Sequence, residues 1–294
     1  MKILVAIDHS EASEAVIKEI AARPWPPNSR VEVLNVLEYA HLWTVSQTYE
    51  EAWQDSTALI ERAVEELRGR GVEANPLMLP GDARTVILDR AKETQADLVF
   101  VGSNGASGLA KFFLGRVAAS VVSHAPCSVE TVRTHRNEAE GKLPGVHRIL
   151  LATDGSEFSE RAARSIAERP WLAGTEIEVL SVVELHLGAT QALFEPPFVE
   201  NDQLELQRAQ SMKRAEEAVA AAVEILAKAF PKVEESISVL LDGPKTVIIN
   251  EAERWDADLI VLGSHGHRGI ERFLLGSVSE GVALHAKCSV EVIR

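Results

Sequence analysis

Short apolar runs alternate with longer amphipathic stretches along the chain, and this alternation predicts strands and helices in turn. In the first half, continuous apolar runs predict strands, whereas apolar residues three and four positions apart predict helices. The expected strands are 3–7, 31–36, 74–79, 98–101 and 128–132. The expected helices run from residue 10 to just before Pro24 and over 57–68, 83–94 and 117–124. Five strands alternating with helices imply a parallel sheet with helices on both faces, because parallel strands need crossover connections.

The second half of the chain repeats the first. The two pairs of blocks that align without gaps are 2–38 with 148–184 and 85–130 with 246–291. They share 18 identities in 37 positions and 22 identities in 46 positions, respectively. A repeat of this length is a domain rather than a solenoid unit. We therefore expect two domains, 1–135 and 146–294, joined by a polar linker that contains glycine and proline.

Composition and charge narrow the possible partners. The chain has 294 residues, with 30 Lys and Arg against 44 Asp and Glu, and hence a net charge of −14. This negative net charge argues against nucleic acids and anionic membranes as partners, because both require a basic field. It is compatible with a small anion that is held by local donors. Cys127 and Cys288 have neither zinc spacing nor a disulfide framework, so we expect a cytoplasmic protein without a metal centre. The N-terminal apolar run meets Asp8 too soon for a signal peptide, and no run approaches the ~20 residues of a membrane span.

A glycine loop follows the fourth predicted strand in each half. In the second half Gly263-Ser264-His265-Gly266 is followed by nine residues and then by Gly276-Ser277, where a helix begins. The first half has the same frame with Gly102-Ser103-Asn104-Gly105 and Gly115-Arg116. Glycines let backbone N–H groups approach a phosphate, and a helix N-terminus supplies unpaired donors with a partial positive charge. The loop leaves the carboxyl end of a strand, where open α/β sheets bind ligands, so this pattern indicates anion capture.

Two side chains near this loop have a further predicted role in helix capping. Ser277 offers a hydroxyl donor and is expected to cap the helix that follows it. Asp154, after the first strand of the second half, is expected both to cap a helix and to contact the ligand. Asp8 stands at the matching position in the first half, where capping alone is an equal alternative. A P-loop sequence is absent, and no G-x-G-x-x-G fingerprint occurs at the first strand–helix turn.

Both halves resemble universal stress protein (UspA-type) domains, and the chain is similar to the tandem members of that family. The resemblance implies two Rossmann-like α/β domains of the adenine nucleotide α-hydrolase-like kind, each with a five-stranded parallel sheet in the order 3-2-1-4-5. It also implies that the fifth strands pair within one chain, so that the two domains form an intramolecular pseudo-dimer. The nucleotide-binding branch of the family carries G-x2-G-x9-G-[ST] and holds ATP. The second half matches this motif at Gly263, Gly266, Gly276 and Ser277.

The resemblance assigns a set of nucleotide-binding residues to each half. In the second half they are Ala152, Asp154, Val182, Gly263, Ser264, Gly266, Gly276, Ser277 and Val278. By their charge, His265, His267, Arg268 and Arg272, in and after this loop, are further candidates to offset phosphate charge, with a solvated loop face as an equal alternative. In the first half they are Ala6, Asp8, Val36, Gly102, Ser103, Gly105, Gly115, Arg116 and Val117. The first half departs from the motif at Arg116, where the family has Ser or Thr. A guanidinium there could bind phosphate directly or could fill the pocket.

Three functions from different classes are compatible with these residues. The first is an ATP-binding universal stress protein, with or without Mg2+, whose interactions with a protein partner change when nucleotide is bound. The second is a slow ATPase, for which His265 and Arg268 are the candidate groups. The third is a nucleotide-free scaffold for dimerisation, which would explain Arg116 in the first half. Two chains could associate further as a homodimer.

Overall fold

The computed structural model describes residues 1–38, 48–103, 114–134, 145–184, 202–240, 243–267 and 275–294. Each half consists of strands alternating with helices, as the hydrophobic pattern predicts. The elements of the first half are β1 (Lys2–Ala6), α1 (Glu11–Ala22), β2 (Arg30–Leu37), α3 (Tyr49–Gly69), β3 (Glu73–Pro80), α4 (Ala83–Thr94), β4 (Leu98–Gly102), α5 (Arg116–His124) and β5 (Ser128–Val132). Those of the second half are β6 (Arg148–Ala152), α6 (Glu157–Glu168), β7 (Glu176–Glu184), α8 (Asp202–Leu226), β8 (Val233–Leu240), α9 (Pro244–Arg254), β9 (Leu259–Gly263), α10 (Ser277–His285) and β10 (Ser289–Ile293).

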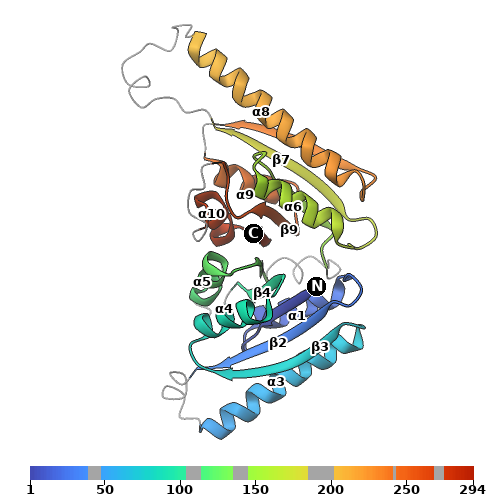
Figure 1. Ribbon diagram of the computed structural model, residues 1–294, viewed down its shortest axis with the longest axis vertical. Helices are drawn as coiled ribbons and strands as arrows, with labels where there is room; N and C mark the ends of the chain where they lie inside the picture. The colour runs from blue at the N-terminus through green and yellow to red at the C-terminus, as the bar shows by residue number, and fades with distance from the viewer. Residues whose placement is uncertain (39–47, 104–113, 135–144, 185–201, 241–242, 268–274) are drawn as a thin grey trace, which may run out of the picture.

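The ten strands form one sheet that extends along the molecule (Figure 1). Their order is β3-β2-β1-β4-β5-β10-β9-β6-β7-β8. Within each half all neighbouring strands are parallel, and each half has the order 3-2-1-4-5. The halves meet where β5 and β10 pair antiparallel, with Glu130 opposite Glu291. The predicted fold and the pairing of the fifth strands are thus confirmed, and the pairing removes two open sheet edges.

The two faces of the sheet differ at this junction. On one face α4, α5, α9 and α10 cover a single apolar core that continues from one half into the other, with Val121 and Val282 among its fully buried members. On the other face α1 and α3 cover a core that belongs to the first half. A separate core beneath α6 and α8 belongs to the second half. Among the described residues, the apolar core is therefore continuous between the halves on the first face and divided in two on the other.

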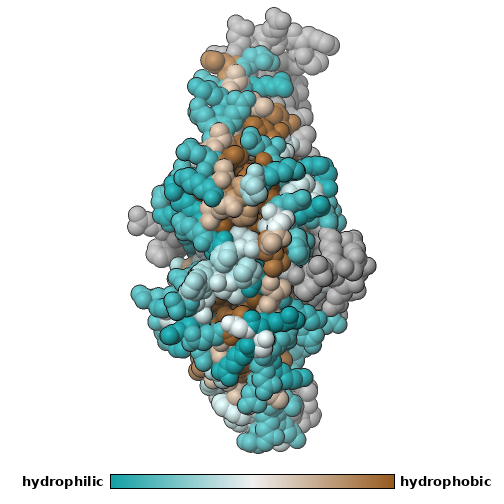
Figure 2. Space-filling view, turned by 90° about the vertical axis from the view of Figure 1, so that its right-hand side faces the viewer, coloured by the Kyte–Doolittle hydropathy of each residue, from teal (hydrophilic) through white to brown (hydrophobic). Residues whose placement is uncertain are grey.

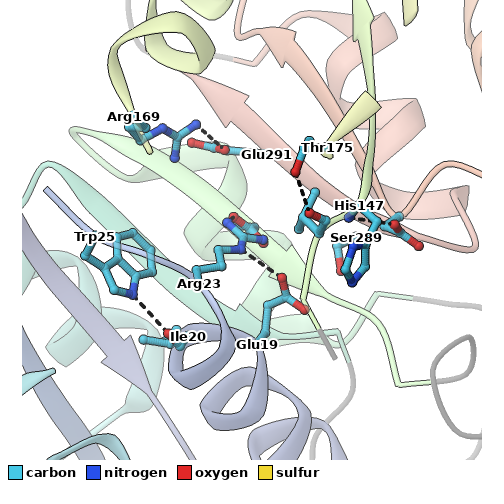
Figure 3. Close-up of polar contacts among 12 residues, drawn as sticks. Glu19, Ile20, Arg23, Trp25, His147, Arg169, Thr175, Ser289 and Glu291 are labelled. Carbon is cyan, nitrogen blue, oxygen red and sulfur yellow. Dashed lines mark hydrogen bonds and ion pairs between the residues drawn. The ribbon is translucent and has the colours of Figure 1, made fainter. Parts of the chain in front are cut away.

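A cluster of buried charged side chains lies between the two separate cores (Figure 3). The Arg23 guanidinium donates to both carboxylate oxygens of Glu130 and, through Nε at 2.8 Å, to Glu19. Arg169 Nη2 donates to Glu291 at 2.8 Å in the second half. None of these five side chains is more than 7% exposed. Each guanidinium thus compensates a carboxylate that water cannot reach.

The cluster has one carboxyl group more than it has guanidinium groups. Glu19 has no acidic counterpart in the second half, where Ser165 stands at the aligned position. Burial raises the pKa of Glu130 to about 7, and the neighbouring carboxylates of Glu291 and Glu19 add to this rise against the attraction of Arg23. Burial and the excess of carboxyl groups therefore favour the protonated form of Glu130 more than in water.

Helix α3 is longer than predicted, because it begins at Tyr49 instead of residue 57. The Thr48 hydroxyl accepts from the Glu51 N–H at 3.2 Å, and the Glu51 carboxylate accepts from the Thr48 N–H at 2.8 Å. This pair is a capping box, and its T-x-x-E spacing was visible in the sequence. The apolar periodicity missed the first turns because most of their side chains are exposed.

Most of the described surface seen in Figure 2 is hydrophilic, with apolar residues gathered along the long axis of the molecule. Among the described residues Tyr49 and Leu206 are large hydrophobic side chains that remain exposed. Within the ranges given above, no helix is both long and apolar enough to cross a membrane. The same ranges contain no cluster of three His, Cys, Asp or Glu side chains that could hold a metal ion.

Candidate functional site

The turn after β6 presents the Asp154 carboxylate at the carboxyl end of the sheet. Asp154 is exposed, and its Oδ1 accepts a hydrogen bond from the Ser156 N–H at 3.0 Å. Ser156, and not Asp154, is the N-cap of α6, where its hydroxyl accepts from the Ser159 N–H. The predicted capping role of Asp154 is therefore wrong, because the helix begins two residues later than that role requires. The remaining Oδ2 atom faces the glycine loop.

Two glycines of the loop are required by close contacts with this turn. A Cβ atom at Gly266 would lie 2.5 Å from Oδ2 of Asp154, and one at Gly263 would lie 2.7 Å from the backbone of Phe158. Cβ atoms are essentially never found below 3.0 Å from such neighbours. Gly263 therefore has no room for a side chain against the backbone, whereas a side chain at Gly266 would displace the Asp154 carboxylate.

The loop is held between β10 and the start of α10. The Ser264 N–H donates to the Ile293 carbonyl at 2.7 Å, and the Gly276 N–H donates to the Ser264 carbonyl at 2.8 Å. Gly276 is the N-cap of α10 and makes no side-chain capping bond. The predicted capping role of Ser277 is wrong, because Ser277 is the first residue inside the helix. This arrangement leaves the first N–H groups of α10 without a capping side chain and directed out of the helix, as an anion site needs.

Histidines add to the contact between the loop and the turn. Nε2 of His267 lies 2.8 Å from the Asp154 carbonyl oxygen, so this ring nitrogen donates. The ring of His265 packs on Phe158 at 5.0 Å, and its Nδ1 lies 3.0 Å from the Ser264 hydroxyl. These contacts fix the loop next to the aspartate. His267 thus contacts the turn that carries Asp154.

The first half builds the same backbone frame. The Ser103 N–H donates to the Val132 carbonyl at 2.9 Å, and the Gly115 N–H donates to the Ser103 carbonyl at 2.7 Å. A Cβ atom at Gly102 would lie 2.8 Å from the side chain of Ala12, the counterpart of Phe158. Arg116 is the first residue of α5, and its side chain is exposed. The assigned residue Gly105 and the candidates Arg268 and Arg272 lie outside the described residues.

The aspartate after the first strand differs between the halves. Oδ1 of Asp8 accepts from the Ser10 N–H at 3.1 Å, from the Ser10 hydroxyl and from the Ser13 hydroxyl at 2.8 Å. In the second half the matching hydroxyl, that of Ser159, donates to the Ser156 carbonyl instead and accepts from Thr153. Asp8 is consequently only half-exposed and is bound within its own turn, whereas the Asp154 side chain is exposed.

A residue difference next to this aspartate accompanies the different hydrogen bonds. Ile7 stands in the first half where Thr153 stands in the second. The Thr153 hydroxyl lies 3.1 Å from Ser159 Oγ and donates to it, whereas Ile7 has no such donor. Ser13, the counterpart of Ser159, instead accepts from the Asp8 N–H at 2.8 Å and donates to the Asp8 carboxylate.

The assigned apolar residues belong to one side of each site. All of them are part of the core that continues through the junction or pack against it: Ala6, Val36, Val117, Ala152, Val182 and Val278. Ala152 is buried and Val182 is half-buried, at the ends of neighbouring strands. They provide an apolar wall beside the exposed carboxylate in the second half.

The sequences of known proteins are similar to this chain over most of its length. The sequence profile of the universal stress protein family matches residues 1–133 and 145–294. A universal stress protein of Mycobacterium bovis is 29% identical over 200 residues, which are 68% of this chain and 62% of that relative, so the chain matches less than two thirds of the relative's length. A universal stress protein of Mycolicibacterium smegmatis is 26% identical over 305 residues, covering 99% of this chain and 96% of the relative.

A solved structure has the same fold over the whole chain. The crystal structure of a universal stress protein from Archaeoglobus fulgidus covers 100% of this chain and is itself covered to 98%, with a TM-score of 0.65 and 20% identity. Because the family profile matches both halves, the chain belongs to the universal stress protein family and contains two of its domains in tandem.

Proposed function

We propose that the protein binds one ATP molecule per chain, in its second domain, and that nucleotide occupancy changes its interactions with a protein partner. The observation that carries this proposal is the contact of the glycine loop with Asp154. A side chain at Gly266 would displace the Asp154 carboxylate, and the N-terminus of α10, which has no side-chain cap bond, follows the same loop. A carboxylate, backbone donors and an apolar wall thus converge at the carboxyl edge of the sheet, where α/β proteins bind ligands.

Each part of the site suits one part of the nucleotide. The N–H groups of the loop and of the first turn of α10 would receive the phosphates, with the Ser277 hydroxyl as a further donor. Asp154 would accept hydrogen bonds from the ribose hydroxyls, and Ala152 and Val182 would contact the adenine. A magnesium ion would be held by the phosphates, since Mg2+ commonly binds through phosphate oxygens and water.

The first domain is proposed to remain free of nucleotide. Oδ1 of its aspartate, Asp8, already accepts from Ser10 and Ser13, so fewer of its acceptor positions remain for a ribose than on Asp154. Arg116 replaces the hydroxyl residue that the family's motif has at the start of the helix. The matched positions of the two domains thus offer built-in controls.

The nucleotide content of freshly purified, denatured protein tests this proposal. We expect about one ATP per chain in the wild type and none in Gly276→Asp. A Cβ atom at Gly276 would lie 3.1 Å from the Ser264 carbonyl oxygen, and a carboxylate there repels phosphate. Gly115→Asp, the matched control in the first domain, should retain one ATP per chain. If the wild type neither contains ATP nor binds it in a titration at millimolar concentration, the proposal is wrong.

The junction of the sheets favours one alternative, a nucleotide-free scaffold. The antiparallel pairing of β5 with β10 and the shared core give the duplicated domain a structural role without any ligand. This alternative predicts no difference between Gly276→Asp and Gly115→Asp in any binding assay. If the bound nucleotide is ADP, a slow ATPase is favoured over both, and phosphate release by the wild type must then exceed that of Gly276→Asp.

A further inference from the structure

An arginine of each domain binds the C-terminal end of the helix that follows the glycine loop in the other domain, α10 or α5. Arg133, directly after β5, crosses to α10, where its Nη2 donates to the carbonyls of Ala283 at 2.9 Å and Leu284 at 3.2 Å. In the reverse direction Nη2 of Arg294 donates to carbonyls of α5, at 2.7 and 3.0 Å. The carbonyls in the last turn of a helix have no partner within it, so each arginine satisfies two of them from across the junction.

Neither arginine is accounted for by pairing with an acid. Arg133 is 6% exposed, and its Nε and Nη1 atoms have no hydrogen-bond partner among the described residues. Among the described residues neither Arg133 nor Arg294 forms an ion pair with a carboxylate, and burial lowers the pKa of both. A buried cation without a counter-charge is costly unless something else compensates it. Here the negative end of the helix dipole is the compensating group.

The opposite end of α10 is the proposed phosphate site. The helix has nine residues, so its ends are about 13 Å apart. Arg133 fixes the C-terminal end and thereby the direction in which the first N–H groups point. Its positive charge also favours an anion at the other end of the same helix, because solvent screens a buried charge less than an exposed one.

We propose that Arg133 of the first domain is a positioning residue for the nucleotide site of the second domain. This inference rests on the proposed function, since it concerns the same site. It means that the second domain does not bind ATP with full affinity by itself. The first domain, without nucleotide of its own, completes the site from the far end of α10.

The test compares Arg133→Met with Arg294→Met in the full-length chain. Both variants lose an arginine with equivalent bonds across the junction, so their effects on stability are matched. We expect Arg133→Met to weaken ATP binding about fivefold in calorimetric titration, whereas Arg294→Met changes it less than twofold. Arg133→Lys, which retains the charge and a donor, should recover most of the affinity.

Binding of a ligand without phosphates distinguishes a purely structural role of Arg133 from a role in positioning the phosphate site. Adenosine should bind Arg133→Met and the wild type equally, because its contacts do not involve the helix N-terminus. An equal loss of ATP affinity in the two methionine variants would overturn the inference, as would an equal loss of ATP and adenosine affinity in Arg133→Met.

Amide hydrogen exchange of the nucleotide-free protein tests whether each arginine stabilises the helix of the other domain. We expect faster exchange in α10 of Arg133→Met and in α5 of Arg294→Met. Unchanged exchange of α10 in Arg133→Met would overturn the inference whether or not ATP binds. If the wild type does not bind ATP but α10 exchanges faster in Arg133→Met, the proposed function and the role of Arg133 in binding are both wrong. The stabilisation of α10 by Arg133 would then be the part of the inference that holds.

Discussion

At the end of β1 an aspartate carboxylate is held by two serines of its own turn, whereas at the end of β6 its counterpart faces a glycine loop. Strand order, loop frame and helix position are otherwise the same in the two domains. The difference accompanies a change one residue earlier, where Ile7 stands in place of Thr153 and a serine hydroxyl binds the carboxylate. Two copies of one fold can therefore give the same acidic group different partners.

The largest effect is expected at the junction, where the two domains also differ. Arg23 compensates two buried carboxylates, Glu130 and Glu19, whereas Arg169 compensates only Glu291. Arg23→Met should lower the free energy of unfolding by about 3–5 kcal/mol, since it leaves buried charges without a partner. Arg169→Met should have a smaller effect in the same urea denaturation experiment. A larger loss in Arg169→Met would show that Glu19 does not share in the network.

The two aspartates should respond differently to the same substitution. Asp154→Asn is expected to weaken ATP binding by about 1.5–3 kcal/mol, the scale of a hydrogen bond to a charged group. Asp8→Asn should leave ATP affinity unchanged, because its carboxylate is bound by Ser10 and Ser13. Calorimetric titration measures both. Equal losses in the two variants would remove the proposed asymmetry.

The odd carboxyl group at the junction predicts a pH dependence. The pKa of Glu130 is raised to about 7 in the folded protein by burial and by nearby carboxylates. A raised pKa stabilises the folded state below the unfolded pKa of about 4.3, and this contribution is lost as pH rises through about 7. Stability should thus fall between about pH 5 and 8, whereas Glu19→Ser, which copies the second domain, should flatten this fall. Urea midpoints with the same slope in both proteins would contradict this account.

The smallest effect is expected from removing the hydroxyl that distinguishes the two turns. Thr153→Val keeps the side-chain shape but removes the hydroxyl that donates to Ser159. We expect the Ser159 hydroxyl then to bind Asp154 as that of Ser13 binds Asp8. ATP affinity should fall about threefold, a change of about 0.6 kcal/mol that lies near the value of one hydrogen bond. An unchanged affinity would mean that Ser159 does not redirect its hydroxyl.

The sequence predicted the strands, the sheet order through the family resemblance, and the two glycine loops. These follow from patterns that repeat along the chain: apolar runs for buried strands, and glycines where the backbone approaches Asp154 or α6 closely. It did not predict the long α3, whose first turns are polar and begin at the Thr48 capping box. It placed helix caps at Asp154 and Ser277, each off by one or two residues, because several capping residues stand in succession there.

Contacts between the domains could not be predicted from either half alone. Arg133 and Arg294 each follow a strand and read as ordinary charged residues in the sequence. Their role depends on the antiparallel pairing of β5 and β10, which brings each one to the helix of the other domain. The same holds for Glu130 and Glu291, which are single charged residues within strands in the sequence and lie buried opposite each other in the complete sheet.

The central claim is that the two domains differ in nucleotide binding. Photolabelling of the full-length protein with 8-azido-ATP, followed by mass spectrometry of the labelled peptides, tests it most directly. We expect the label, prevented by excess ATP, on peptides of the second domain only, near β6, β7 or the loop after β9. Comparable labelling of the first domain, or labelling of the first domain alone, would contradict the claim.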